Sequence, residues 1–263
     1  MPPDLPDQPS APGPPEPAPW YKVLSFLFAL AFLAAIFTFA FSTVHYRWNW
    51  RGVWVYRAEF LKGWLVTIVL SAVSLVTSCF IGLTLALLRR IPFLPLRYLA
   101  RIYVEVIRGT PLLVQLLIFF YVVATAFHID NRYIVGVLTL SAFSGAYISE
   151  VIRAGIESIG QSQLDSARAI GLTTAQTYRY VIFPQAIRQI LPPLAGQFAS
   201  LIKDSSLLSI ISINEFTFNA QNVSSYTYSN FESYLPLAAG YLLLTLPISL
   251  WTQSLERRNR FET

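Results

Sequence analysis

The sequence predicts an all-α fold, a polytopic membrane helix bundle, on three observations. Hydrophobic residues make up 54% of the 263 positions and charged residues only 13%, a balance not expected of a soluble domain of this size. Long uncharged runs occur, the first at Val23–Phe41, and about 20 apolar residues suffice to cross a bilayer core. The basic residues cluster at the ends of these runs, so the net charge of +5 fits the positive-inside bias better than nucleic-acid binding.

The first 59 residues are expected to form three parts. Residues 1–20 are proline-rich, which predicts a disordered cytoplasmic tail, and a solvated tail is favoured over a partner-binding one. The tail lacks the basic region and cleavage site of a signal peptide. Residues 21–43 hold the first span. Residues 44–59 are expected to be a periplasmic loop whose tryptophans and tyrosines mark the membrane boundary.

Five further spans follow from apolar runs bounded by charged residues or breakers. A polar loop over 214–233 separates the last two of them. The expected spans are 63–88, 98–127, 133–152, 190–213 and 234–255.

The Lys and Arg count predicts which face is cytoplasmic. Eleven arginines fall on the face that bears residues 161–193, so this segment and both termini are expected inside the cell. Around the first span alone, the count favours the reverse orientation, because the outer loop carries Arg47, Arg51 and Arg57 and the inner side only Lys22. The count over the whole chain outweighs this local count. The eleven are Arg89, Arg90, Arg97, Arg101, Arg153, Arg168, Arg179, Arg188, Arg257, Arg258 and Arg260.

The segment 161–193 is polar and helix-compatible, and it lies between apolar runs. Ser162 and Asp165 are predicted to cap a first short helix that ends at Gly171. Thr173 or Thr174 is predicted to cap a second helix, which Pro184 closes. Two short helices joined by a glycine make a docking knob on one membrane face. An amphipathic helix lying on lipid is the alternative, but it requires neither the glycine nor the proline.

Polar residues inside the expected spans are candidates for a solute path, because a charge inside a bilayer costs roughly 3 kcal/mol or more and usually faces a bundle interior or water. In the third span Arg101, Glu105 and Arg108 share one helix face, and Gly109–Pro111 is expected to break the helix. The candidates are Glu105, Arg108, Gln115, Tyr147, Glu150, Lys203, Asp204 and Ser205.

Each of these candidates has a second interpretation. An ammonium group would need Asp204 or a glutamate, and a carboxylate would need Lys203 or Arg108. Alternatively, the charged residues pair with one another and fix the packing of the helices, or they lie at the depth of the lipid headgroups. This second interpretation is favoured for Glu105 and Arg108. For Lys203 and Asp204 both interpretations stay open, and Gln115 could make an interhelical hydrogen bond.

The spacing within 161–193 resembles the EAA loop of ABC importer permeases: Glu-Ala-Ala, three residues, Gly, nine residues, Ile-x-Leu-Pro. This chain has Asp165-Ser166-Ala167, Gly171 and Val181-Ile182-Phe183-Pro184 at those spacings, with four conservative differences. The stretches YVEVIRGTPLLVQL, SGAYISEVIRAGIESI and LIKDSSLLSIISINEF are similar to permease subunits of the polar amino acid uptake family, which serves histidine, glutamine, arginine and glutamate systems. The resemblance covers 63–255.

The resemblance implies a permease subunit of an ATP-driven amino acid importer, located in the bacterial inner membrane. It implies a five-span core over 60–256 with the first span as an addition, and a cytoplasmic tail over 257–263. Coupling to ATPase subunits would run through 161–193. The coupling residues carried over from the motif are Asp165, Ser166, Ala167, Gly171, Val181 and Pro184.

The resemblance also implies partners. These are two ATPase subunits that bind ATP and Mg²⁺, a second permease subunit that is identical or paralogous, and an extracytoplasmic amino acid-binding protein. This chain lacks a G-x-x-x-x-G-K-[ST] phosphate loop, so it is expected to be no enzyme and to hold no cofactor. The one cysteine, Cys79, lies in an apolar run, which excludes a disulfide framework and a Cys/His metal site.

Two other classes of protein remain open at this stage. An ion-gradient carrier would act alone and usually carries an internal inverted repeat, which the sequence does not show. A membrane scaffold without a path would leave Lys203 and Asp204 unexplained.

Overall fold

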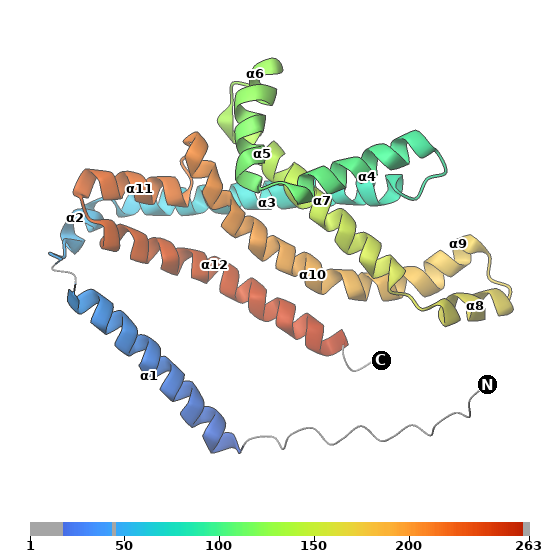
Figure 1. The fold of residues 1–263 in the computed structure, drawn as a ribbon, viewed down its shortest axis with the longest axis horizontal. Helices are drawn as coiled ribbons and strands as arrows, with labels where there is room; N and C mark the ends of the chain where they lie inside the picture. The colour runs from blue at the N-terminus through green and yellow to red at the C-terminus, as the bar shows by residue number, and fades with distance from the viewer. Residues whose placement is uncertain (1–17, 44–45, 260–263) are drawn as a thin grey trace, which may run out of the picture. The chain divides into compact units, whose positions relative to one another are not determined.

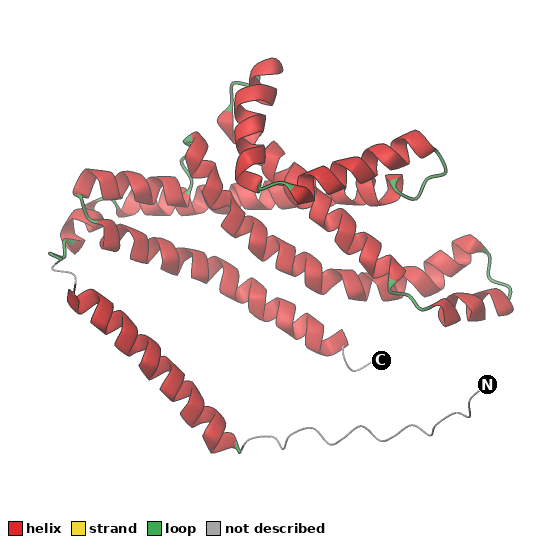
Figure 2. Ribbon diagram, in the orientation of Figure 1, coloured by secondary structure: helices red, strands yellow, loops and turns green. Residues whose placement is uncertain are grey.

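The computed structural model describes residues 18–43 and 46–259, and the chain divides into two units, Met1–Trp48 and Asn49–Thr263. Every regular element of the described residues is a helix (Figure 2). The predicted all-α class is therefore confirmed. Residues 1–17 of the expected tail and 260–263 at the C-terminal end lie outside the described residues.

The first unit contains one helix, α1 (Pro19–Thr43), which holds the predicted first span. Its apolar side chains are exposed along the whole helix, and it buries none of its residues within the chain. Such a helix needs an apolar solvent or a partner to cover it. It begins at Pro19, two residues inside the expected tail, because proline is tolerated in the first turn of a helix.

The second unit holds all remaining helices (Figure 1). The expected loop over 44–59 is wrong in part, because residues 50–55 form a short helix that Asn49 caps through its side chain. The bounds are α2 Trp50–Val55, α3 Arg57–Leu88, α4 Leu94–Gly109, α5 Leu112–Ile118, α6 Ala124–Ala126, α7 Arg132–Glu157, α8 Gln161–Ala169, α9 Thr174–Thr177, α10 Phe183–Asp204, α11 Phe216–Thr227 and α12 Asn230–Asn259.

The centre of this unit is the contact between α3 and α7. Two glycines let the helices approach closely, in the small-residue packing typical of membrane helices. A Cβ at Gly82 would lie 2.6 Å from Cγ2 of Ile148, and one at Gly145 would lie 2.7 Å from Cγ2 of Ile81. The reciprocal pattern places each isoleucine over the glycine of the other helix.

The expected third span is broken at the predicted position. Helices α4 and α5 are bent by 113° at residues 110 and 111, so 98–127 is not one straight span. The Gln115 side-chain amide donates to the carbonyl oxygens of Ile107 (2.7 Å) and Thr110 (3.1 Å). It therefore satisfies carbonyls that the broken helix leaves without partners. A π-helical turn at Phe119–Val123 then joins α5 to α6.

The expected end of a helix at Pro184 is wrong. A π-helical turn over Tyr178–Ile182 carries α9 directly into α10, and Pro184 lies in the first turn of α10. The wider turn removes the hydrogen bond that proline cannot make, so the helix continues. Pro192 and Pro193 also lie inside α10. The helix that holds the expected fifth span therefore starts earlier, at Phe183, and the last part of that span, Ser205–Ile211, is a 3₁₀ helix.

The expected loop over 214–233 is also wrong, because it contains helix α11. Glu215 caps α11 by accepting hydrogen bonds from the backbone N–H groups of Thr217 (2.8 Å) and Phe218 (2.7 Å). The Asn219 amide donates to the backbone carbonyl of Glu59 at 2.9 Å. The polar residues that suggested a loop are thus used in capping and in packing α11 on α3.

Four described helices are long and apolar enough to cross a membrane: α1, α3, α7 and α12, or five spans if the bent α4–α5 pair is counted as one. Helix α10 falls short of this criterion, because glutamines and prolines interrupt its apolar residues. The predicted polytopic membrane protein is confirmed, whereas the count of six spans is not reproduced by these criteria.

Candidate functional site: an arginine–glutamate cluster and the segment 161–193

The described residues bring three arginines onto one carboxylate, that of Glu150 in α7. Arg89, which ends α3, and Arg153, one turn along α7, both bond to it, the latter at 2.7 Å. Arg108 in α4 lies 3.5 Å from the same group. The Glu150 side chain is only 15% exposed, so the carboxylate compensates charges that would otherwise stay uncompensated at the junction of three helices.

The Arg108 guanidinium also lies over the ring of Tyr147, 5.4 Å from its centroid, which adds a cation–π contact. Arg108 is 40% exposed and faces a cavity of about 460 Å³, lined also by Glu150, Gln189 and Pro193. The guanidinium keeps donors that the ion pair does not use. The arrangement can therefore hold a carboxylate in the cavity.

The structure thus brings together three of the eight predicted path residues, Arg108, Tyr147 and Glu150. Glu105 is exposed and forms no ion pair with Arg101 or Arg108 within the described residues, so sharing a helix face did not predict a contact. Gln115 bonds to the end of α4, as described above.

Lys203, Asp204 and Ser205 lie elsewhere, at the end of α10. Lys203 is exposed and Asp204 half-buried, and within the described residues no ion pair joins them. The Ser205 hydroxyl donates to the carbonyl oxygen of Ile202 at 2.7 Å. The possibility that Lys203 and Asp204 pair with each other is therefore not realised.

Sequence reasoning missed the roles of Arg89 and Arg153, which it used only to predict orientation. Their signal is partly visible, because Glu150, Arg153 and Glu157 recur at the three- and four-residue spacings of one helix face. Arg153 bonds to both glutamates. The Arg89 contact joins positions 61 residues apart and has no local signal.

Sequence reasoning also missed a buried acidic group, Glu215, which is fully buried. Tyr241 donates to its carboxylate at 3.1 Å, and Thr67 lies 3.5 Å from it. Burial outweighs these hydrogen bonds and raises the pKa of Glu215 from 4.5 to about 7. Glu215 lies outside the helices that qualify as membrane spans.

The segment 161–193 has the expected two short helices, α8 and α9, at one end of the second unit (Figure 1). Gly171 has φ +78°, and the N–H groups of Gly171 and Leu172 bond to the carbonyls of Arg168 and Ala167 at 2.9 and 3.0 Å. This pair of bonds is a Schellman motif, which needs a left-handed residue at the glycine position.

The second helix of the segment begins as predicted. Thr173 and Gln176 form a capping box, in which each side chain bonds to the backbone N–H of the other. The predicted Ser162–Asp165 cap is wrong, because Gly160 occupies the N-cap position of α8 without a side-chain bond. Asp165 instead pairs with Arg168 at 3.2 Å, on the exposed surface.

The outer surface of this segment presents large apolar side chains. We call the four of them the knob face, and none is less than half exposed. They are Ile170 (76% exposed), Tyr180 (62%), Phe183 (50%) and Ile187 (53%). Of the predicted coupling residues, Asp165, Ser166, Gly171 and Pro184 are exposed, Val181 is half-buried, and Ala167 is buried. Large apolar side chains that stay exposed beside a turn fixed by hydrogen bonds are suited to a protein-binding surface.

Comparison with known proteins defines the class of this chain. Residues 78–261 match the model of a family described as "binding-protein-dependent transport system inner membrane component". The "Probable glutamine ABC transporter permease protein GlnM" of Bacillus subtilis is 36% identical over 76% of this chain and 92% of its own length. The glutamine transport system permease protein GlnP of Escherichia coli K12 is 33% identical over 81% of this chain and 98% of its own length.

The fold has a solved counterpart. A crystal structure of an amino acid ABC transporter with histidines contains a chain that is 37% identical, covering 81% of this chain and all of that one, with a TM-score of 0.76. The chain belongs to the family of inner membrane components of binding-protein-dependent transport systems. It is a permease component, not an ATPase. The resemblance stated from the sequence is therefore confirmed.

Proposed function

We propose that this chain is the permease subunit of an ATP-driven amino acid importer in the bacterial inner membrane, with residues 161–193 on the cytoplasmic side as the coupling element. Family membership, together with relatives named for glutamine transport, supports the substrate class. The observation that carries the coupling role is the segment 161–193 itself. Its turn is fixed by a Schellman motif and a capping box, and its knob face is apolar and exposed.

The partners follow from this role. Two ATPase subunits, which bind ATP and Mg²⁺, dock on the knob faces of two permease subunits, and a binding protein delivers the solute outside. ATP is bound more tightly in one state of the assembled transporter and the solute in another. This difference in affinity couples ATP binding to solute transport. The ion-gradient carrier and scaffold alternatives receive no support from the family match.

Within the path, Arg108 binds the solute carboxylate, and Glu150 positions Arg108. Glu150 already accepts hydrogen bonds from Arg89 and Arg153 and forms an ion pair with Arg108, so it has little capacity left for an ammonium group. Tyr147 holds the guanidinium from its ring face. Lys203 and Asp204 remain proposed path residues, and the structure leaves both without an ion-pair partner among the described residues.

The test is uptake by the assembled transporter, reconstituted in liposomes with its ATPase and binding protein. ATP-dependent uptake of an amino acid from a panel is expected, and Arg108→Gln should raise KM about tenfold or more, because a charged hydrogen bond to the carboxylate is lost. The charge-matched control is Arg257→Gln, at an exposed position of α12. Uptake driven by an ion gradient without ATP would overturn the importer assignment. An unchanged KM in Arg108→Gln would overturn the role of Arg108 alone.

A further inference from the structure

A polar pocket of about 330 Å³ lies between the start of α3 and helix α11, and it shares no residue with the Arg108 cavity. One face of each helix lines it, because the α3 residues are three positions apart and the α11 residues recur every three or four positions. We call it the asparagine pocket. Its polar and aromatic lining residues are Tyr56 and Glu59 at the start of α3, Asn214 before α11, and Asn219, Asn222 and Tyr226 in α11.

The two walls of the asparagine pocket are packed closely on each other. A Cβ at Gly63 of α3 would lie 2.9 Å from Nδ2 of Asn219 and 2.9 Å from Cα of Phe216. The Asn219 side-chain amide donates to the backbone carbonyl of Glu59 at 2.9 Å, so it bridges the walls. No described residue donates to the side-chain oxygen of Asn219. The pocket is therefore preformed and keeps this oxygen as an acceptor.

The asparagine pocket holds further acceptors that the fold does not use. The side-chain amides of Asn214 and Asn222 make no hydrogen bond with any described residue. The Glu59 carboxylate forms an exposed ion pair with Lys62 at 2.8 Å, and such surface pairs contribute little to stability. The described residues that line the pocket include no Lys or Arg. The pocket thus carries one negative charge that no lining cation balances.

Two tyrosine rings lie beside these acceptors. The ring centroids of Tyr56 and Tyr226 are 6.0 Å apart, with 43° between the ring planes, and Tyr226 is 66% exposed. The face of a tyrosine ring attracts a guanidinium or ammonium group, while carboxylate and amide oxygens accept hydrogen bonds from its N–H groups. Together these groups suit an organic cation.

The turn that follows α11 points to a protein as the carrier of this cation. Helix α11 ends at Thr227, and Tyr228 follows with φ +52°, a left-handed conformation that usually favours glycine. The Tyr228 side chain is 89% exposed, so it gains almost no packing within the chain in return for the backbone strain. Exposed tyrosines are enriched among the residues that dominate protein–protein binding.

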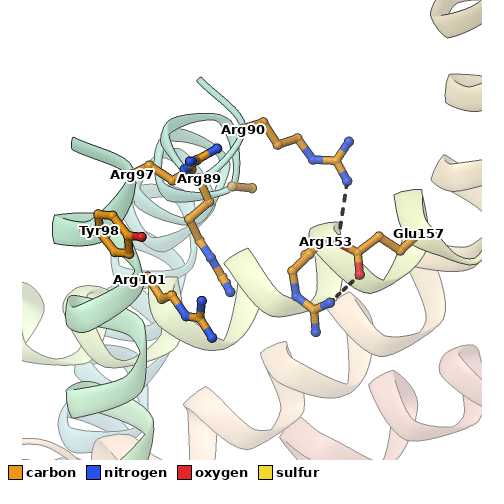
Figure 3. Close-up of a pocket in the computed structure, with 8 residues that line it drawn as sticks. Arg89, Arg90, Arg97, Tyr98, Arg101, Arg153 and Glu157 are labelled. Atoms are coloured by element: carbon orange, nitrogen blue, oxygen red, sulfur yellow. Dashed lines mark hydrogen bonds and ion pairs between the residues drawn. The ribbon is translucent and has the colours of Figure 1, made fainter. Parts of the chain in front are cut away.

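The asparagine pocket faces the outer side of the membrane in the proposed orientation. It lies at the start of α3, whereas Arg89 and Arg90 follow the end of α3, among the arginines that Figure 3 draws. The 32 residues of α3 span about 48 Å at 1.5 Å per residue. Figure 1 likewise shows α11 at one end of the second unit and α8 and α9 at the other.

We propose that the asparagine pocket is a cation site, which receives a guanidinium or alkylammonium side chain of a protein docked on the outer face. In the proposed assembly this protein is the amino acid-binding protein, so the identity of the partner rests on the proposed function. The incoming cation takes the place of Lys62 at the Glu59 carboxylate. The side-chain oxygens of Asn214 and Asn222 accept its remaining N–H groups.

The test uses the transporter assembled with its ATPase in liposomes, and it measures ATP hydrolysis against the concentration of solute-loaded binding protein. Glu59→Gln should raise the half-saturating concentration about tenfold, because a charged hydrogen bond is lost. Asn222→Asp adds a carboxylate of the same shape and should lower this concentration about threefold. Lys62→Gln frees the Glu59 carboxylate and should leave it at or below the native value. Hydrolysis at saturating binding protein should stay native in all three variants.

Three outcomes decide against the proposal. Native half-saturation in both Glu59→Gln and Asn222→Asp, in a transporter that the binding protein stimulates, would overturn the cation site and leave the proposed function standing. An increase in Lys62→Gln equal to that in Glu59→Gln would assign the ion pair a structural role only. A native transporter that the binding protein does not stimulate would overturn the proposed function, and this partner with it.

Agmatine, a small molecule with one guanidinium and one ammonium group, separates a protein side chain from a free cation. Agmatine should compete with the binding protein in the native transporter, and should compete less in Glu59→Gln. If agmatine binds the native chain in detergent but does not shift the half-saturating concentration of binding protein, the ligand is a free cation and the docking role is overturned.

Discussion

The carboxylate of Glu150 in α7 lies 3.5 Å from the guanidinium of Arg108 in α4 and also accepts from Arg89 at the end of α3. One side chain therefore joins three helices. The same contact aims Arg108 toward the cavity that is proposed to hold the solute carboxylate.

Replacing Glu150 by leucine should destabilise the fold strongly. The change leaves three arginines without their common partner, and breaking a mostly buried charge pair costs about 3 kcal/mol or more. The free energy of unfolding, measured in detergent by denaturant titration, should fall by about this amount. Glu105→Leu removes an exposed glutamate without an ion pair among the described residues and should change it by less than about 0.5 kcal/mol. Equal losses in the two variants would refute the role of the cluster.

Replacement by alanine should have opposite effects at Gly82, in the contact of α3 with α7, and at Gly196 in α10. In Gly82→Ala the new Cβ meets Cγ2 of Ile148 at 2.6 Å and the backbone carbonyl of Gly145 at 3.0 Å, so overpacking should cost about 1–3 kcal/mol. Gly196 in α10 has nothing within 4 Å of such an atom. Gly196→Ala should therefore be neutral or stabilising by up to about 1 kcal/mol, through helix propensity. Thermal melting of both variants measures the difference, and a destabilised Gly196→Ala variant would contradict the geometry.

The buried Glu215 predicts a specific pH dependence. Its pKa is raised to about 7 in the folded chain, from an ordinary value of 4.5. Its contribution to stability is therefore complete below pH 4.5 and is lost as the pH rises through about 7, where the buried carboxyl must ionise. The difference in melting temperature between the native chain and Glu215→Gln should fall over this window and level off above it. A difference that stays constant with pH, or grows, would show that Glu215 titrates normally.

The capping box predicts which threonine of the segment 161–193 stabilises helix α9. Thr173→Ala removes the cap of α9, at a cost of about 1 kcal/mol, whereas Thr174→Ala changes only the first helical residue. Hydrogen exchange of the backbone amides of residues 175–177 should accelerate in the first variant and stay nearly native in the second. If the two variants exchange alike, the capping box does not hold α9.

Local signals in the sequence were sufficient where neighbouring residues decide the structure. The turn at Gly171, which needs a left-handed residue, was predicted correctly, and Thr173 was one of the two threonines predicted for the cap of α9. The break before Pro111 follows equally from local sterics. The apolar helices were found because length and composition alone identify them.

The errors have both local and distant causes. Pro184 usually ends a helix, but the π-helical turn before it lets the chain continue into α10. Helix α11 was taken for a loop because its polar residues gave no periodic signal, while Asn219 bonds to the backbone of Glu59, 160 positions away. Of the candidate site, the sequence supplied Arg108, Tyr147 and Glu150 but not Arg89, since only the packed helices bring Arg89 to Glu150.

The most direct test of the central claim, that residues 161–193 couple this permease to an ATPase, is co-purification with candidate ATPase subunits in detergent. Gly171→Pro is incompatible with the φ of +78° at this position and should misplace the knob face, so the ATPase should be lost. The native chain and Gly196→Ala should both retain it. Retention of the ATPase by Gly171→Pro, or its absence from the native chain, would contradict the account.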